Sequence, residues 1–136
     1  VRESSHKMPL EVGHAYIAKG GKHLRVSRKT SGYELLHGDE ETVSGHKPSV
    51  DALFESVHEN FTGTVVAVLL TGMGRDGARG MLALRRGGSY TIGQSEDSCV
   101  VYGMPRVAKE VGGVEVELPL SKIASAIEAR CWPSEK

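Results

Sequence analysis

The chain has 136 residues, and its 17 lysine and arginine residues balance its 17 aspartate and glutamate residues. That length fits one domain with a single buried core, and a formal net charge of zero gives no reason to expect a nucleic acid partner. Val65–Leu70, the longest apolar run, is far shorter than the roughly 20 residues that span a bilayer, so we expect no direct membrane insertion.

Two cysteines, Cys99 and Cys131, form no disulfide framework or metal-ligand pattern, which favours a reducing cytoplasm. The chain opens on Val1 rather than on methionine, so we expect it to be a piece of a longer protein. We interpret residues 1–12 as a flexible lead-in and residues 132–136 as a tail.

The first third of the remaining chain has a β pattern. His14–Ala18 and Leu24–Ser27 are short strand-like runs on either side of Lys19–Lys22, whose two glycines predict a hairpin turn. A third run, Tyr33–Leu36, is expected to extend this hairpin before a polar loop over residues 37–47.

After Pro48 the periodicity becomes helical, with Ser49 as the predicted N-cap. The residues that define this helix share one face at helical spacing: Val50, Leu53, Phe54, Val57 and Phe61. Val65–Leu70 follows without alternation of polar and apolar residues, which is typical of a strand covered on both faces.

Helices and strands then alternate to the end of the chain. We expect a helix over Ala78–Arg86, a strand at Tyr90–Ile92, a helix opened by Pro105, a strand over Val114–Leu118 and a last helix capped by Ser121. This order predicts parallel strands joined by right-handed crossovers, and therefore an α/β sheet with an added hairpin.

The glycine-rich loop Thr71–Gly77 lies where the buried strand turns into a helix, the side of an α/β sheet at which ligands and catalytic groups gather. Its glycines match G-x-G-x-x-G, and Glu96 lies 24 residues after the first of them, as in a dinucleotide-binding site. Asp76 opposes that interpretation, because its carboxylate would stand beside the pyrophosphate at the helix N-terminus.

Two other interpretations of Asp76 remain open on the local pattern. The side chain is expected either to cap the helix that starts at Ala78, or to hold a histidine on a neighbouring strand end during acyl transfer. In the second case the glycines would leave backbone N–H groups open toward an oxyanion.

The loop T-G-M-G-R-D-G-A-R-G-M resembles the signature loop of the chemotaxis methylesterase (CheB) family. Three more blocks resemble the family in the same order: G-H-A-Y-I-A-K-G-G-K-H-L from Gly13, H-K-P-S-V-D-A-L-F from His46 and S-C-V-V-Y-G-M-P-R from Ser98. The resemblance implies a doubly wound, mainly parallel α/β sheet with an antiparallel hairpin, here incomplete. Residues 13–131 would be the C-terminal portion of the catalytic domain.

The resemblance also implies an activity and its residues. Asp76 matches the aspartate of the family's Ser-His-Asp triad, and Met73 matches the residue whose backbone amide helps to hold the oxyanion. The family hydrolyses glutamate methyl esters on chemoreceptors, with release of methanol, and deamidates certain receptor glutamines. No metal or organic cofactor takes part.

The family's nucleophilic serine and triad histidine precede the segment that matches Gly13, as does its receiver domain, and this sequence carries none of them. The expected partners are therefore the methylated chemoreceptor and the N-terminal part of the same protein, including the receiver domain. Three hypotheses follow: a methylesterase domain seen in part, a non-catalytic fragment or degenerate relative that binds a receptor or partner, and, weakest, a nucleotide-binding α/β domain.

Few residues of this sequence are candidates to replace the missing serine and histidine of the triad. Ser4, Ser5 and His6 lie in the expected lead-in, without the strand-turn-helix context of a nucleophile. Ser95 lacks the second glycine of a nucleophile elbow, and Cys99 is expected to be a buried structural thiol. His46 belongs to a family block and is the histidine most worth following; surface or core-edge roles are expected for the others that we considered, namely His14, His23, His37 and His58.

Overall fold

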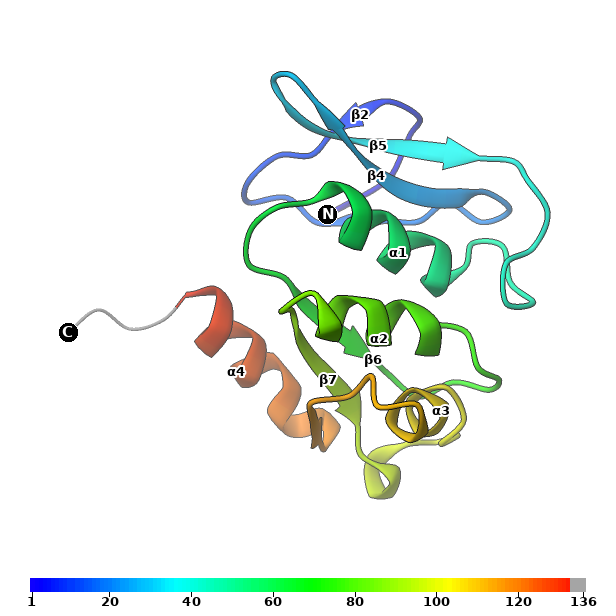
Figure 1. Cartoon of the computed structure of the whole chain (residues 1–136), viewed down its shortest axis with the longest axis vertical. Coiled ribbons are helices and arrows are strands. Elements are labelled where there is room, and N and C mark those ends of the chain that lie inside the picture. Colours follow the sequence, from blue (N-terminus) through cyan, green and yellow to red (C-terminus); the bar gives the residue numbers. More distant parts are fainter. Residues whose placement is uncertain (133–136) are drawn as a thin grey trace.

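The computed structural model of the chain describes residues 1–132. Its elements, in chain order, are β1 (Arg2–Glu3), β2 (Met8–Pro9), β3 (Tyr16–Ile17), β4 (His23–Lys29), β5 (Gly32–Gly38), α1 (Val50–Asn60), β6 (Val66–Leu69), α2 (Ala78–Arg86), β7 (Tyr90–Gln94), a 3-10 turn (Glu96–Ser98), α3 (Met104–Glu110), β8 (Val116–Leu118) and α4 (Leu120–Cys131) (Figure 1). No helix within residues 1–132 is long and apolar enough to cross a membrane.

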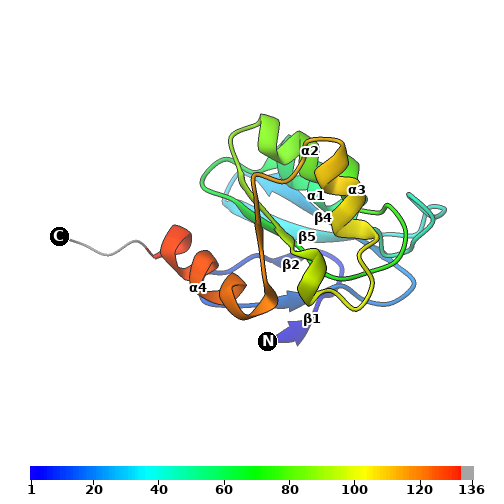
Figure 2. The same cartoon turned by 90° about the horizontal axis from the view of Figure 1, so that it is seen from below.

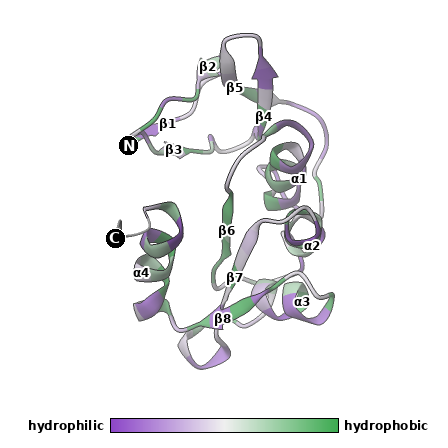
Figure 3. Cartoon of the chain, turned by 60° about the vertical axis from the view of Figure 1, so that its left-hand side comes forward, coloured by the Kyte–Doolittle hydropathy of each residue, from purple (hydrophilic) through white to green (hydrophobic). Residues whose placement is uncertain are grey.

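A parallel sheet in the order β6-β7-β8 forms the centre of the C-terminal half. Helices α2 and α3 pack on one face of this sheet and α4 on the other (Figures 2 and 3). The core between the sheet and α2 includes Leu69, Met81 and Leu84, each at most 3% exposed. This arrangement confirms the predicted α/β fold, with helices on both faces of a parallel sheet.

Strand β6 is apolar along its whole length, V-A-V-L; Ala67 and Leu69 are buried and Val66 and Val68 are half-buried, with helices lying on both sides of the sheet (Figure 3). Its register with β7 runs from Val66 opposite Tyr90 to Leu69 opposite Gly93. Within residues 1–132, β6 pairs with no strand on its other side, so one row of its backbone donors and acceptors is open.

The antiparallel hairpin exists and contains two of the three predicted runs, Leu24–Ser27 and Tyr33–Leu36, but not the first one, His14–Ala18. Strand β4 pairs with β5 through the short turn that joins Lys29 to Gly32, and β2 adds to the far side of β5. The glycine turn at Lys19–Lys22 only redirects the chain, because the preceding strand β3 pairs in parallel with β1. The predicted hairpin between His14–Ala18 and Leu24–Ser27 was therefore wrong.

Residues 1–12 are not the flexible lead-in that their polarity suggested. The backbone of β1 hydrogen-bonds along β3, and that of β2 along β5. Ser4, between them, is only 3% exposed. At the other end α4 stops at Cys131 and Trp132 follows it, so the rest of the predicted tail, residues 133–136, lies outside the described residues.

Helix α1 begins as predicted, with Ser49 as its N-cap: the Ser49 hydroxyl accepts a hydrogen bond from the amide of Ala52. The helix lies between the hairpin, which it meets through Leu53 and Val57, and α2 (Figure 1). Helix α4 differs from its prediction. It starts at Leu120, and the extended residue before it, Pro119, occupies the N-cap position without a side-chain hydrogen bond, so Ser121 lies inside the helix and is not its cap.

Candidate active site

The loop Thr71–Gly77 leaves the carboxyl end of β6 and leads into α2, so its residues stand at the edge where an α/β sheet places its site (Figure 1). Gly77 needs to be glycine for two reasons. Its φ is +98°, and an added Cβ would lie 2.8 Å from Leu69 Cδ1 and 3.1 Å from Val50 Cγ1. This close packing joins the loop to the first turn of α1.

Asp76 is 2% exposed and its carboxylate is held by the first turn of α1. Oδ1 accepts hydrogen bonds from the Ser49 hydroxyl at 2.9 Å and from the Asp51 amide at 3.0 Å. Oδ2 accepts one from the Val50 amide at 2.8 Å. Asp76 therefore does cap a helix, but it caps α1, which lies earlier in the chain, and not the helix at Ala78 that the sequence suggested.

A carboxylate from α1, that of Asp51, caps the start of α2 in the same way. Asp51 of α1 is 1% exposed, and its Oδ1 accepts from the Gly80 amide in the first turn of α2 at 2.8 Å. Its Oδ2 accepts from the Ser44 hydroxyl at 2.6 Å. The carboxylate of Asp76, just before α2, therefore lies at the amino end of α1, and the carboxylate of Asp51, in α1, lies at the amino end of α2. Each offsets the positive end of the helix dipole that it contacts. The amino end of α2 already holds an anion, which opposes the nucleotide-binding interpretation.

The side chain of His23 supports Asp76 indirectly, through Ser49. Its ring is fully buried, its Nδ1 accepts from the Ser49 amide at 3.3 Å, and its Nε2 donates to the Glu41 carbonyl at 2.9 Å. These partners assign the neutral tautomer with the proton on Nε2. His23 therefore fixes Ser49, which in turn fixes Asp76. The sequence did not reveal this role, because nothing local links a strand histidine to a helix cap 26 residues later.

Met73 lies at the outer turn of the same loop. Its side chain is 76% exposed. Its backbone N–H has no hydrogen-bond acceptor within residues 1–132. A backbone donor that stands free at the carboxyl edge of a parallel sheet is the kind of group that stabilises an oxyanion.

His46 comes close to this loop without touching Asp76. Its ring Nε2 lies 3.8 Å from the point where a Cβ on Gly74 would be, and the side chain is exposed. Within residues 1–132, no hydrogen bond joins His46 to Asp76, whose partners are Ser49, Val50 and Asp51. His46 is beside the loop but is not the base of a triad in this structure.

The other serine and histidine candidates lie elsewhere. Ser4 Oγ and His37 Nε2 are 2.9 Å apart, and the His37 amide donates to His6 Nδ1 at 3.0 Å. Ser4 and His6 were expected to lie in a flexible lead-in, and instead their contacts with His37 tie the β1–β2 connection to β5. Ser95 donates to Asp97 within the 3-10 turn. None of them contacts Asp76.

Cys99 is partly buried in the segment that follows β7. Burial raises the pKa of its thiol above the ordinary value. A thiol with a raised pKa is less ionised at neutral pH and is a poor nucleophile. This agrees with the structural role expected for Cys99.

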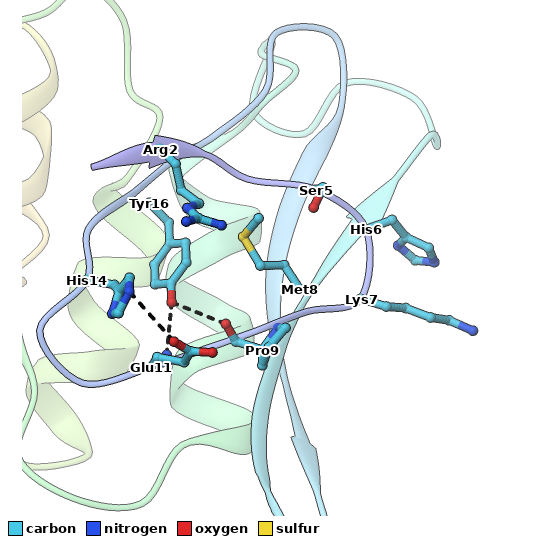
Figure 4. A pocket seen from close by; sticks show the side chains of 9 residues that line it. All are labelled: Arg2, Ser5, His6, Lys7, Met8, Pro9, Glu11, His14 and Tyr16. Carbon is cyan, nitrogen blue, oxygen red and sulfur yellow. Dashed lines mark hydrogen bonds and ion pairs between the residues drawn. The ribbon is translucent and has the colours of Figure 1, made fainter.

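A hollow of about 270 Å³ lies in the N-terminal part of the chain and is lined only by residues between Arg2 and Tyr16 (Figure 4). The Tyr16 hydroxyl accepts from the Glu11 amide at 2.9 Å and donates to the Pro9 carbonyl at 3.2 Å. The Glu11 carboxylate is 3.6 Å from His14 Nε2. These contacts close a surface loop on itself, and neither Asp76 nor Met73 lines the hollow.

The fold and the loop together define an α/β protein with a buried carboxylate and a free backbone amide at the carboxyl edge of its parallel sheet. The family model of the CheB methylesterases matches residues 1–127, and the chain belongs to this family. The match begins at residue 1, in agreement with the ordered strands β1 and β2.

Curated relatives carry the name protein-glutamate methylesterase/protein-glutamine glutaminase. The protein from Rhizobium johnstonii is 52% identical over 128 residues, which are 93% of this chain and 37% of that protein. The protein from Photobacterium profundum is 48% identical over 127 residues, which are 93% of this chain and 36% of that protein. The chain therefore spans little more than a third of the length of these relatives.

The crystal structure of the Thermotoga maritima CheB methylesterase catalytic domain superimposes with a TM-score of 0.87 at 29% sequence identity. The superposition covers 92% of this chain and 66% of that domain. These likenesses confirm both the family inferred from the four sequence blocks and the α/β fold.

Proposed function

We propose that this chain forms the C-terminal portion of the catalytic domain of a protein-glutamate methylesterase, which hydrolyses glutamate methyl esters and deamidates glutamines on chemoreceptors. The family match and the printed names of the relatives support the activity. The observation that carries the proposal is Asp76, a buried carboxylate held rigidly at the carboxyl edge of β6.

Asp76 retains the capacity that a triad acid needs. A carboxylate offers about four acceptor positions, and three are filled by Ser49, Val50 and Asp51. The remaining position is on Oδ2, where an imidazole N–H could donate. An acid in that place holds the histidine tautomer that accepts the serine proton, and it stabilises the imidazolium that results. The serine and the histidine would come from sequence outside this chain.

The amide of Met73 would supply the oxyanion donor. When the serine hydroxyl adds to the ester carbonyl, the carbonyl oxygen becomes an alkoxide and the histidine takes the proton. Collapse of this intermediate expels methanol, which receives that proton, and water then hydrolyses the acyl-enzyme to the glutamate carboxylate. In deamidation the leaving group is ammonia. A preorganised N–H at the alkoxide typically contributes about a hundredfold to a thousandfold in turnover.

The same proposal covers partners and location. The methylated chemoreceptor is the substrate, and the N-terminal part of the same protein, with its receiver domain, is the regulatory partner. The protein would work in the cytoplasm without a metal or organic cofactor. Within residues 1–132, no group of three or more histidine, cysteine or acidic side chains is arranged to hold a metal.

One observation favours a second candidate, a non-catalytic module that binds a receptor or partner. Every hydrogen bond that Asp76 makes in residues 1–132 goes to the first turn of α1, which is what a purely structural cap would do. In that case the loss of Asp76 would lower stability and leave no catalytic effect of its own.

A chimaeric enzyme separates the two candidates. In this chimaera the chain replaces the matching segment of the Rhizobium johnstonii relative, so that serine, histidine and receiver domain are all supplied. The assay is methanol release from methylated receptor. We expect Asp76→Asn to lower kcat by several orders of magnitude, because an amide favours the wrong histidine tautomer.

Ser49→Ala is the matched control for this experiment. It removes one hydrogen bond to Asp76 and costs about 1 kcal/mol of stability, but it keeps the carboxylate. Because Ser49 helps to hold Asp76, we expect the Ser49→Ala chimaera to lose some turnover, but far less than the Asp76→Asn chimaera. If Asp76→Asn and Ser49→Ala affect kcat equally little, Asp76 is a structural cap and the non-catalytic candidate is preferred.

A further inference from the structure

The peptide unit between Gly72 and Met73 is clamped from one side. The Gly72 carbonyl accepts two hydrogen bonds, from the Gly103 amide at 3.1 Å and from the Met104 amide at 2.8 Å. The peptide bond is trans, so its N–H points away from its C=O. The two bonds that hold the Gly72 carbonyl therefore also direct the Met73 N–H to the opposite side, where it has no acceptor in residues 1–132.

The segment that clamps this peptide is itself joined to the loop at its base. The Gly72 amide donates to the Val101 carbonyl at 3.1 Å. The Thr71 hydroxyl donates to the same carbonyl at 2.9 Å and accepts from the Val101 amide at 2.8 Å. The Thr71 amide donates to Oε1 of Gln94, which is 1% exposed, at 2.7 Å. Residues 101–104 and residues 71–72 thus form one rigid unit.

Close backbone approach is the condition for this arrangement. A Cβ on Gly103 would lie 2.7 Å from the Gly72 carbonyl oxygen, 3.1 Å from the Gly74 amide nitrogen and 3.2 Å from Met73 Cα. All three neighbours are backbone atoms of the loop, which cannot turn aside as a flexible side chain can. Only a residue without Cβ lets the two segments meet at this distance.

We infer that residues 101–104, with Gly103 at the point of contact, are the positioning element that aims the Met73 N–H at the oxyanion. Gly103 and Thr71 act through the Gly72–Met73 peptide and do not touch the substrate. The inference rests on the proposed function, since it assigns a cause to the orientation of that donor. It also gives a physical reason for the block S-C-V-V-Y-G-M-P-R, whose middle residues make the clamp.

The test uses the chimaeric enzyme described above. Gly103→Ala should lower kcat at least tenfold with little change in KM, because a misdirected donor weakens transition-state stabilisation but leaves ground-state binding intact. Gly20→Ala is the matched control, since a Cβ there meets nothing within 4 Å and its φ is permissive. We expect the Gly20→Ala chimaera to keep the parent kcat and KM.

Two less disruptive substitutions of Thr71 test the same role if the Gly103→Ala chimaera does not fold. Thr71→Val removes both hydroxyl contacts with Val101 while keeping the side-chain shape, and Thr71→Ser keeps the hydroxyl. We expect Thr71→Val to lower kcat and Thr71→Ser to restore it. If folded Gly103→Ala keeps the parent kcat, or if Thr71→Val and Thr71→Ser turn over equally, the positioning role is wrong.

The failure of this inference differs from the failure of the proposed function. An active Asp76→Asn chimaera would contradict the triad, whatever Gly103→Ala does. An inactive Asp76→Asn chimaera together with a fully active Gly103→Ala chimaera would contradict the positioning role alone.

Discussion

Replacement of Asp51 by alanine should destabilise the chain through the helix pair that holds Asp76. Asp51 is 1% exposed and accepts from the buried Gly80 amide and from the Ser44 hydroxyl. A buried donor left without an acceptor costs about 1–3 kcal/mol, and the half-buried Ser44 hydroxyl can turn to water. We therefore expect Asp51→Ala to lower the free energy of unfolding by about 2–3 kcal/mol.

Two further variants make this estimate specific. In Asp51→Asn the side-chain oxygen can still accept from Gly80 and the amide can donate to the Ser44 oxygen, so we expect a loss of only about 1 kcal/mol. Glu55→Ala, on the same helix, removes an ion pair with Arg79 that is largely solvent-exposed and should cost less than about 1 kcal/mol. Urea titrations of the 136-residue chain and its three variants, all at the same protein concentration because the chain is expected to associate, are followed by far-ultraviolet circular dichroism. A loss for Asp51→Ala no larger than that for Glu55→Ala would show that the Asp51 carboxylate does not stabilise the α1–α2 pair.

Three other predictions concern the chain as a whole and its ionisation. The chain alone should release no methanol from methylated receptor, because within residues 1–132 no histidine contacts Asp76 and the one hydroxyl that does, that of Ser49, is buried as a helix cap; release above the buffer rate would contradict this. The open edge of β6 should make the chain self-associate or require a partner strand, so sedimentation that shows a concentration-independent monomer with a sharp melt would be the opposing result. The hydrogen bond from Tyr102 to Glu117, together with burial, raises the pKa of Tyr102 to about 12, so this phenol should ionise last in an absorbance titration. The stabilisation that this hydrogen bond gives to the folded chain is complete below pH 10 and is lost as the pH rises toward 12. Glu117→Gln should move the pKa of Tyr102 back toward 10, and ionisation of Tyr102 near pH 10 in the parent chain would contradict this role of Glu117.

Local sequence signals were sufficient for the elements that are defined by their own residues. Ser49 and the helical periodicity after it predicted α1, and the unbroken apolar run predicted β6. Helix α2 begins at Ala78 and ends at Arg86, as expected from the glycines around it. In these cases capping, period and turn residues all agree with the final fold.

Pairing between distant segments was where sequence reasoning failed. The glycine turn at Lys19–Lys22 looked like a hairpin because a short pattern does not show that β3 belongs beside β1. The polar composition of residues 1–12 hid two strands whose stability comes from backbone hydrogen bonds to β3 and β5. The capping preference of Ser121 did not decide where α4 begins, because the helix starts one residue earlier, at Leu120.

The candidate site shows the same division. The loop around Asp76 and Met73 could be located from its glycines and from the family resemblance. The partners of Asp76 could not, because Ser49, Val50 and Asp51 lie 25 to 27 residues away and meet it only through the packing of α1 on α2. The buried His23 behind Ser49 was missed for the same reason.

A crystal structure of the chimaeric enzyme, in which the distance from Asp76 Oδ2 to the nearest imidazole nitrogen is measured, tests the triad role of Asp76 most directly. We expect a histidine nitrogen within about 2.6–3.2 Å of Oδ2, with a serine hydroxyl at the other nitrogen of the same ring. The hydrogen bonds from Ser49, Val50 and Asp51 should be retained alongside it. A structure in which Asp76 contacts only the first turn of α1, with no histidine in reach, would contradict the claim that Asp76 is the acid of the triad.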